Sequence, residues 1–119
     1  MTILLVDDDP LIRLAAGYVL VAAGHALLEA EDVATAVALA RTTRIDLMLL
    51  DVVLDGADGR DVVAAVRALP GCEKTRFAFL TGRADAEREA LLQLGAAGVI
   101  AKPFDLASLA SQVEQLALQ

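Results

Sequence analysis

The side chains best suited to chemistry in this chain are polar groups that follow short apolar runs. They are the carboxylates of Asp7, Asp8, Asp9 and Asp51, the hydroxyl of Thr81 and the amine of Lys102. Carboxylates crowded together repel one another unless a cation lies among them, and Mg²⁺ prefers such oxygen ligands. If the fold gathers these residues at one edge, the acidic cluster predicts a magnesium site.

The same groups have the chemistry of a phosphoacceptor site. A carboxylate beside bound Mg²⁺ can attack phosphorus and form an aspartyl phosphate, provided that positive charge balances the transferred oxygens. Lys102 and the metal ion would supply that charge, and the Thr81 hydroxyl can donate a hydrogen bond to a phosphoryl oxygen. Each group would therefore have a distinct role in one phosphoacceptor site.

Apolar runs that alternate with longer amphipathic stretches predict the elements that position these residues. Strands are expected at 3–6, 26–30, 45–51, 76–81 and 98–101, and helices at 10–21, 33–42, 60–69, 85–94 and 106–118. The strand runs lack a period-two alternation, which is typical of a parallel sheet covered by helices on both faces. The expected fold class is α/β, a doubly wound five-stranded parallel sheet, and such sheets bind ligands at the carboxyl ends of their strands.

Aspartates also stand where the helices are expected to begin. A carboxylate at such a position can accept hydrogen bonds from the free backbone N–H groups of the first helical turn. The residues interpreted as helix starts or caps are Asp9, Asp32, Asp58, Asp85 and Asp105. Asp9, which precedes Pro10, is therefore assigned to a helix start in preference to the metal site.

Four motifs spread along the chain resemble the signatures of the response-regulator receiver family, and the resemblance covers essentially the whole chain. They are LLVDDDP, LLDVVLDGADG, FLTG and AKPF. The resemblance implies a flavodoxin-like (βα)5 receiver fold, similar to that of chemotaxis regulators, with residues 1–119 as a single receiver domain. It also implies phosphorelay signal transduction, in which a phosphohistidine donor phosphorylates the domain in a Mg²⁺-dependent reaction and partner binding switches.

The resemblance assigns four residues to the metal. Asp7 and Asp8 resemble the family's acidic pair, with Asp8 the more direct ligand and Asp7 acting largely through water. Asp51 would be a further ligand, and the backbone carbonyl of Val53 would complete the protein ligands of Mg²⁺.

The resemblance assigns the other site residues to the phosphoryl group. Asp51 resembles the phosphoacceptor, Thr81 the switch hydroxyl, and Lys102 the phosphate-binding lysine, which Pro103 follows in what is often a cis peptide. One position departs from the family, because Val99 stands where a Tyr or Phe commonly acts as a rotameric switch. We expect catalysis to survive, since Val99 is not a ligand, and output through ring burial to be weaker.

Two alternative functions share part of this pattern. A phosphohydrolase of the haloacid-dehalogenase type also uses an aspartate nucleophile with Mg²⁺, but it needs a second aspartate two residues later, where this chain has Val53. A degenerate receiver that acts only as a binding module is the other alternative, although all the site residues are present. The chemistry expected is self-phosphorylation and autodephosphorylation, so the chain is not expected to be a turnover enzyme.

The composition limits partners and location. A net charge of −7 argues against direct nucleic-acid binding by this segment. No run approaches the ~20 apolar residues of a membrane span, and no secretory signal precedes the first strand. The chain is therefore expected in the cytoplasm, away from the membrane. Its expected phosphodonor is a sensor histidine kinase or a histidine phosphotransfer protein, while the output partner and a homodimer stay open.

Overall fold

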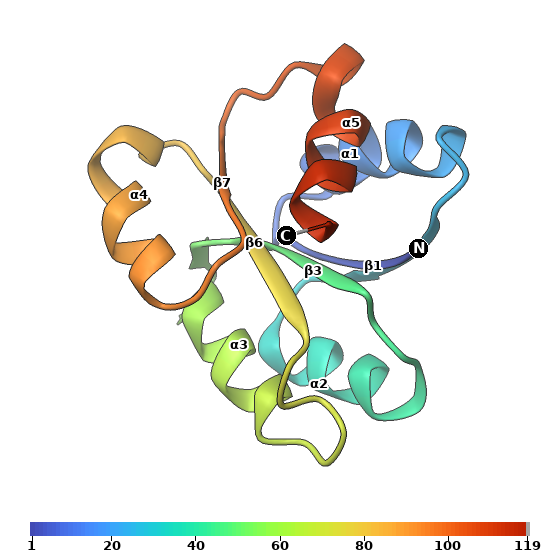
Figure 1. The fold of residues 1–119 in the computed structure, drawn as a ribbon, viewed down its shortest axis with the longest axis vertical. Helices are drawn as coiled ribbons and strands as arrows, with labels where there is room; N and C mark the ends of the chain where they lie inside the picture. Colours follow the sequence, from blue (N-terminus) through green and yellow to red (C-terminus); the bar gives the residue numbers. More distant parts are fainter. Residues whose placement is uncertain (119) are drawn as a thin grey trace.

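The computed structural model describes residues 1–118, which form a parallel sheet between two layers of helices (Figure 1). The strands of this sheet are β1 (Thr2–Val6), β2 (Ala26–Ala30), β3 (Leu47–Asp51), β6 (Arg76–Thr81) and β7 (Val99–Ala101). They are arranged in the order β2-β1-β3-β6-β7, and every neighbouring pair is parallel. The doubly wound five-stranded sheet predicted from the sequence is confirmed, and β3 lies at its centre.

Helices cover both faces of the sheet. They are α1 (Pro10–Ala22), α2 (Val33–Thr42), α3 (Gly59–Arg67), α4 (Ala84–Gln93) and α5 (Leu106–Ala117). The buried residues of α1 and α5 belong to one apolar cluster, and those of α2, α3 and α4 belong to another. Figure 1 shows α1 and α5 on one side of the sheet, with α2 and α3 on the opposite side. No helix in the described part of the chain is long and apolar enough to cross a membrane.

The central strand shows why the apolar runs lack alternation. Leu47 and Leu49 of β3 pack in the cluster with α1 and α5, whereas Met48 and Leu50 pack in the cluster with α2, α3 and α4. Successive side chains of a strand point to opposite faces, and here both faces are covered. Every position of the strand interior is therefore apolar.

The segment after β3 contains a feature that the sequence did not predict. Two short strands, β4 (Val53–Leu54) and β5 (Ala57–Asp58), pair in an antiparallel hairpin. Gly56 lies in the turn with a φ of 73°, a backbone conformation that favours glycine. The expected helix at 60–69 begins at Gly59 and ends at Arg67, and the other predicted boundaries differ from the observed ones by no more than two residues.

Most of the predicted helix starts agree with the structure. The side chains that accept a backbone N–H at an N-cap are Asp9, Asp32, Asp58 and Asp105. The prediction for Asp85 was wrong, because α4 begins at Ala84 with Arg83 as its N-cap and no side-chain capping bond. The N–H of Arg83 instead donates to the Thr81 hydroxyl oxygen at 3.0 Å, which turns the chain into the helix before Asp85 is reached.

Candidate functional site

The strand order places four strand ends side by side at the carboxyl edge of the sheet. Asp7 and Asp8 follow β1, and Asp51 is the last residue of β3, the neighbouring strand. Thr81 ends β6 on the other side of β3, and Lys102 directly follows β7. Residues that are far apart in the sequence therefore meet around the end of the central strand.

Three carboxylates form the acidic part of the site. One carboxylate oxygen from each of Asp7, Asp8 and Asp51 lies within 4.8 Å of the other two. Asp7 is fully buried, and its two oxygens already have protein partners, since Oδ1 accepts the N–H of Asp9 at 2.9 Å and Oδ2 accepts Lys102 Nζ at 2.8 Å. Asp8 is exposed and Asp51 is half-buried, so these two carboxylates are more open to a ligand.

Lys102 connects two of these acids. Its Nζ lies 2.8 Å from Asp7 Oδ2 and 3.1 Å from Asp51 Oδ2. Burial by itself lowers the pKa of Lys102, but the hydrogen bonds and negative charges of Asp7 and Asp51 outweigh it and raise this pKa above 10.5. Lys102 is therefore a stable cation. The peptide bond between Lys102 and Pro103 is cis, as the resemblance implied.

The surroundings of Asp51 disfavour its charged form, whereas those of Lys102 favour the charged form of the lysine. Burial is the main cause that raises the pKa of Asp51 above its ordinary value of 3.8, and the charge of Asp7 adds to it. Lys102 and the hydrogen bond from the Val53 N–H act in the other direction without cancelling the rise. The ionised form of Asp51 is thus held in an unfavourable environment, which additional positive charge would relieve.

Thr81 is buried next to this cluster, but its hydroxyl is bonded elsewhere. The hydroxyl donates to Glu87 Oε1 of α4 at 2.9 Å and accepts the N–H of Arg83 at 3.0 Å. The structure therefore brings the Thr81 backbone to the site while its hydroxyl is directed to α4. Glu87 was missed by the sequence analysis, because a glutamate six residues after Thr81 on an amphipathic helix gives no distinguishing signal.

Val53, in β4, and Gly59, the first residue of α3, complete the surroundings of Asp51. The N–H of Val53 donates to Asp51 Oδ1 at 3.3 Å, and the role of its carbonyl as a metal ligand stays a prediction. Gly59 lies so close to the strand that a Cβ there would be 2.1 Å from the Asp51 carbonyl oxygen. The sequence analysis assigned only a helix start or cap to the preceding residue, Asp58, so the steric requirement at Gly59 was also missed.

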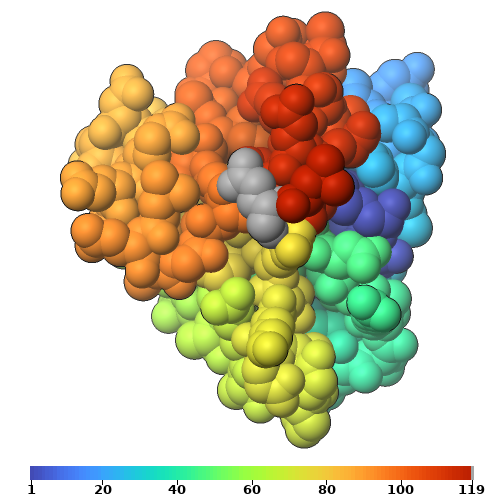
Figure 2. Space-filling view, viewed as in Figure 1, coloured from blue at the N-terminus to red at the C-terminus, as the bar shows by residue number. Residues whose placement is uncertain are grey.

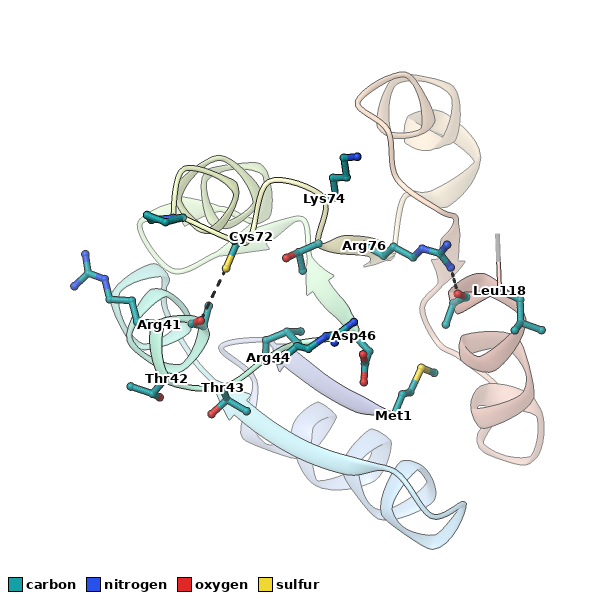
Figure 3. Close-up of a pocket in the computed structure, with 16 residues that line it drawn as sticks. Met1, Arg41, Thr42, Thr43, Arg44, Asp46, Cys72, Lys74, Arg76 and Leu118 are labelled. Atoms are coloured by element: carbon teal, nitrogen blue, oxygen red, sulfur yellow. Dashed lines mark hydrogen bonds between the residues drawn. The ribbon is translucent and has the colours of Figure 1, made fainter.

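A cavity of about 920 Å³ lies at the opposite edge of the sheet. None of the candidate site residues lines it, whether Asp7, Asp8, Asp51, Val53, Thr81 or Lys102. Basic side chains border it, including Arg41, Arg44 and Lys74, and Figure 3 shows Arg41 and Lys74 pointing away from its centre. The cations do not converge on one point. We therefore place the functional site at the acidic cluster, where charged groups from several strands do converge.

A five-stranded doubly wound sheet with acids and a lysine at the carboxyl ends of its strands defines the architecture of a receiver domain. The chain belongs to the response regulator receiver domain family, which it matches over residues 3–114. It is therefore a receiver domain of the kind found in response regulators, the proteins of phosphorelay signalling.

Individual relatives agree with this assignment. The chain is 36% identical over 117 residues to the transcriptional activator protein IrlR of Burkholderia pseudomallei, covering 98% of this chain and 50% of that protein. It resembles the chemotaxis protein CheY4 of Vibrio cholerae with a TM-score of 0.88 and 29% identity, over 97% of both chains. The receiver domain of the sensor histidine kinase PA1611 from Pseudomonas aeruginosa, solved with magnesium in its active site cleft, gives 0.85 and 29%, over 99% of this chain and 98% of that one. The chain thus spans about half the length of IrlR.

Proposed function

We propose that this receiver domain accepts a phosphoryl group on Asp51 from a phosphohistidine donor, in a cytoplasmic phosphorelay, and then changes which partner it binds. The observation that carries the proposal is the bridge made by Lys102, whose Nζ contacts both Asp7 and Asp51 beside the exposed carboxylate of Asp8. This arrangement combines a nucleophile, a fixed cation and free oxygen ligands within one site.

The acidic cluster fits a hard divalent cation. Its three carboxylates offer oxygen ligands within 4.8 Å of one another, and oxygen is the ligand type that Mg²⁺ prefers. We propose that Asp8 and Asp51 hold the ion, that Asp7 acts largely through water, and that the Val53 carbonyl is a further ligand. When bound, Mg²⁺ would neutralise the carboxylates and the developing charge on the phosphoryl oxygens. A solved relative of this chain, the PA1611 receiver domain, contains magnesium in its active site cleft.

The chain's own residues then divide the transfer. A carboxylate oxygen of Asp51 forms a bond to phosphorus while the phosphorus–nitrogen bond of the donor histidine breaks, leaving the electron pair on the imidazole. Lys102 can exchange its contact with Asp51 for one with a phosphoryl oxygen while its ion pair with Asp7 stays in place. The Thr81 hydroxyl must leave Glu87 before it can donate to the phosphoryl group. Hydrolysis of this acyl phosphate resets the domain, so no separate substrate is turned over.

The phosphodonor that fits this chemistry is a sensor histidine kinase or a histidine phosphotransfer protein. The bond to be cleaved is a phosphoramidate, which transfers readily to a carboxylate once charge is balanced. The net charge of −7 supports a protein donor and a protein output partner over nucleic acid.

The test is direct phosphorylation of the isolated chain. With Mg²⁺ and a small-molecule phosphodonor, one acid-stable, base-labile phosphoryl group should form, and borohydride trapping with mass spectrometry should place it on Asp51. Asp51→Asn should remove the label. Asp55→Asn, four residues further along in the exposed loop, is the matched control and should keep it. Full labelling of Asp51→Asn at another residue refutes the assignment, and an unlabelled wild type supports the degenerate receiver.

A further inference from the structure

The hydroxyl of Thr81 is hydrogen-bonded to a residue outside the acidic cluster. It donates its proton to Glu87 Oε1 at 2.9 Å and accepts the Arg83 N–H at 3.0 Å. A hydroxyl carries one proton, so it can donate to only one acceptor at a time. While Glu87 accepts that proton, Thr81 cannot donate to a phosphoryl oxygen.

Glu87 and the adjacent Arg88 both make hydrogen bonds that join α4 to the sheet. Glu87 bonds the end of β6, and Arg88 donates from Nη1 to the Val99 carbonyl of β7 at 3.0 Å. Because β7 is the edge strand, α4 lies at the rim of the molecule, where Figure 2 shows it protruding at the left. Of the two attachments, only the one through Glu87 reaches a residue of the candidate site.

This chain lacks the aromatic side chain that commonly acts as a rotameric switch in the family, because Val99 occupies that position. Val99 is buried and belongs to the same apolar cluster as Ala84, the first residue of α4. A valine side chain has no ring that could move between an exposed and a buried position. A signal that passes from Thr81 to α4 without such a ring can use the hydrogen bonds that join the Thr81 hydroxyl to Arg83, the N-cap of α4, and to Glu87 in its first turn.

We propose that Glu87 is a positioning residue that holds the Thr81 hydroxyl away from the phosphoryl site, and that its release on phosphorylation transmits the signal to α4. The inference rests on the proposed function of Asp51. A carboxylate is a strong acceptor for a hydroxyl, and a phosphoryl oxygen that carries more negative charge can compete for the same proton. Once the Thr81 hydroxyl donates to the phosphoryl oxygen, Glu87 has lost its hydrogen-bond donor. The negative charges of Glu87 and the phosphoryl group then repel each other, which favours movement of the first turn of α4.

The variant Glu87→Ala tests the competition, with Glu89→Ala as the matched control. Glu89 is an exposed glutamate on the same helix, so its removal makes the same change in net charge. The affinity for beryllium trifluoride, a mimic of the phosphoryl group, is measured with Mg²⁺ by calorimetry. Glu87→Ala should bind the mimic about three- to tenfold more tightly, the effect of removing one competing hydrogen bond. Glu87→Gln, which keeps a neutral acceptor, should fall between Glu87→Ala and the wild type.

A second background shows whether the effect passes through the hydroxyl. In Thr81→Val the proton is absent, so adding Glu87→Ala should leave the affinity for the mimic unchanged. Amide hydrogen exchange gives a readout that needs no ligand, because Glu87→Ala without the mimic should already show the faster exchange in α4 that the mimic induces in the wild type. Neither change is expected in Glu89→Ala.

The outcomes separate this inference from the proposed function. If the wild type binds the mimic and is labelled on Asp51 while Glu87→Ala behaves like Glu89→Ala, the role of Glu87 is refuted and the function stands. An equal gain from Glu87→Ala with and without the Thr81 hydroxyl also refutes it. A wild type that neither binds the mimic nor is labelled refutes the function, and the release step with it.

Discussion

Gly59 offers the sharpest test of how the scaffold supports the site. A Cβ at this position would lie 2.1 Å from the Asp51 carbonyl oxygen, 3.1 Å from its carbonyl carbon and 3.3 Å from a ring carbon of Phe79. The nearest of these atoms belongs to backbone, which cannot rotate away as a flexible side chain would. In Gly59→Ala either α3 or the end of β3 must therefore move by about 1 Å or more, because an ordinary non-bonded contact between heavy atoms is ~3.5 Å.

The size of the effect follows from two opposing contributions. Overpacking of a well-packed site costs about 1–3 kcal/mol, and the upper half of that range applies because both contacting elements are rigid. Replacing glycine by alanine in a helix returns at most about 1 kcal/mol, and less in the first turn. We expect Gly59→Ala to be destabilised by about 2 kcal/mol, which for a domain of this size lowers Tm by roughly 6–10 °C.

Urea unfolding of the metal-free protein measures this difference, and Gly82→Ala is its control. Gly82 has no heavy atom within 4 Å of an added Cβ and has no positive φ, so the alanine should be accommodated within about 0.5 kcal/mol. Gly59→Ala should also be phosphorylated more slowly, since the displaced backbone carries Asp51. The reasoning is refuted if Gly59→Ala unfolds within about 0.5 kcal/mol of the wild type, or if Gly82→Ala loses as much.

Three further predictions concern the metal, the pH dependence and the switch. Mg²⁺ at about 100 times its Kd should stabilise the domain by about 2.7 kcal/mol, and Asp8→Asn should largely abolish this gain; unchanged affinity by calorimetry removes Asp8 from the site. Because the pKa of Asp51 is raised in the fold, the stability that its protonated form provides is present below the ordinary 3.8 and is lost as the pH rises through the folded value. Metal-free Asp51→Asn should therefore unfold at higher urea than the wild type at pH 7, and at equal urea near pH 3; no gain at pH 7 contradicts the shift. Val99→Tyr should strengthen the response of α4 and β7 to a phosphoryl mimic by NMR while phosphorylation stays within about threefold, since the position contributes no ligand; a full concerted response already present in the wild type contradicts this.

The sheet could be predicted from the sequence because its signals are long. In the central strand the run LMLL at 47–50 is apolar throughout, and Asp51, the polar residue that follows it, marks the carboxyl end. Parallel topology then brings Asp7, Asp51 and Lys102 to one edge without further information. The hairpin of β4 and β5 could not be predicted in the same way, because strands of two residues leave no periodic pattern.

The details that were missed depend on contacts between elements. The start of α4 at Ala84 is set by the hydroxyl of Thr81, which takes the Arg83 N–H, so a search for capping aspartates misplaced it at Asp85. The partner of that hydroxyl, Glu87, becomes visible only when α4 is placed beside β6. Sequence patterns indicate which residues reach the site, but the direction in which a hydroxyl points depends on neighbours that are not adjacent in the chain.

The division of the apolar interior into two clusters has a consequence for how such a domain can diversify. Leu20 and Leu109 pack on one face of the sheet and Val62 and Leu91 on the other, so substitutions on opposite faces share few neighbours and should combine almost additively. Either helical layer can then drift toward a new binding surface while the opposite layer keeps the strands in register. The candidate site residues lie at the strand ends, between the two helical layers, so either layer can change its binding surface without altering the geometry of the site.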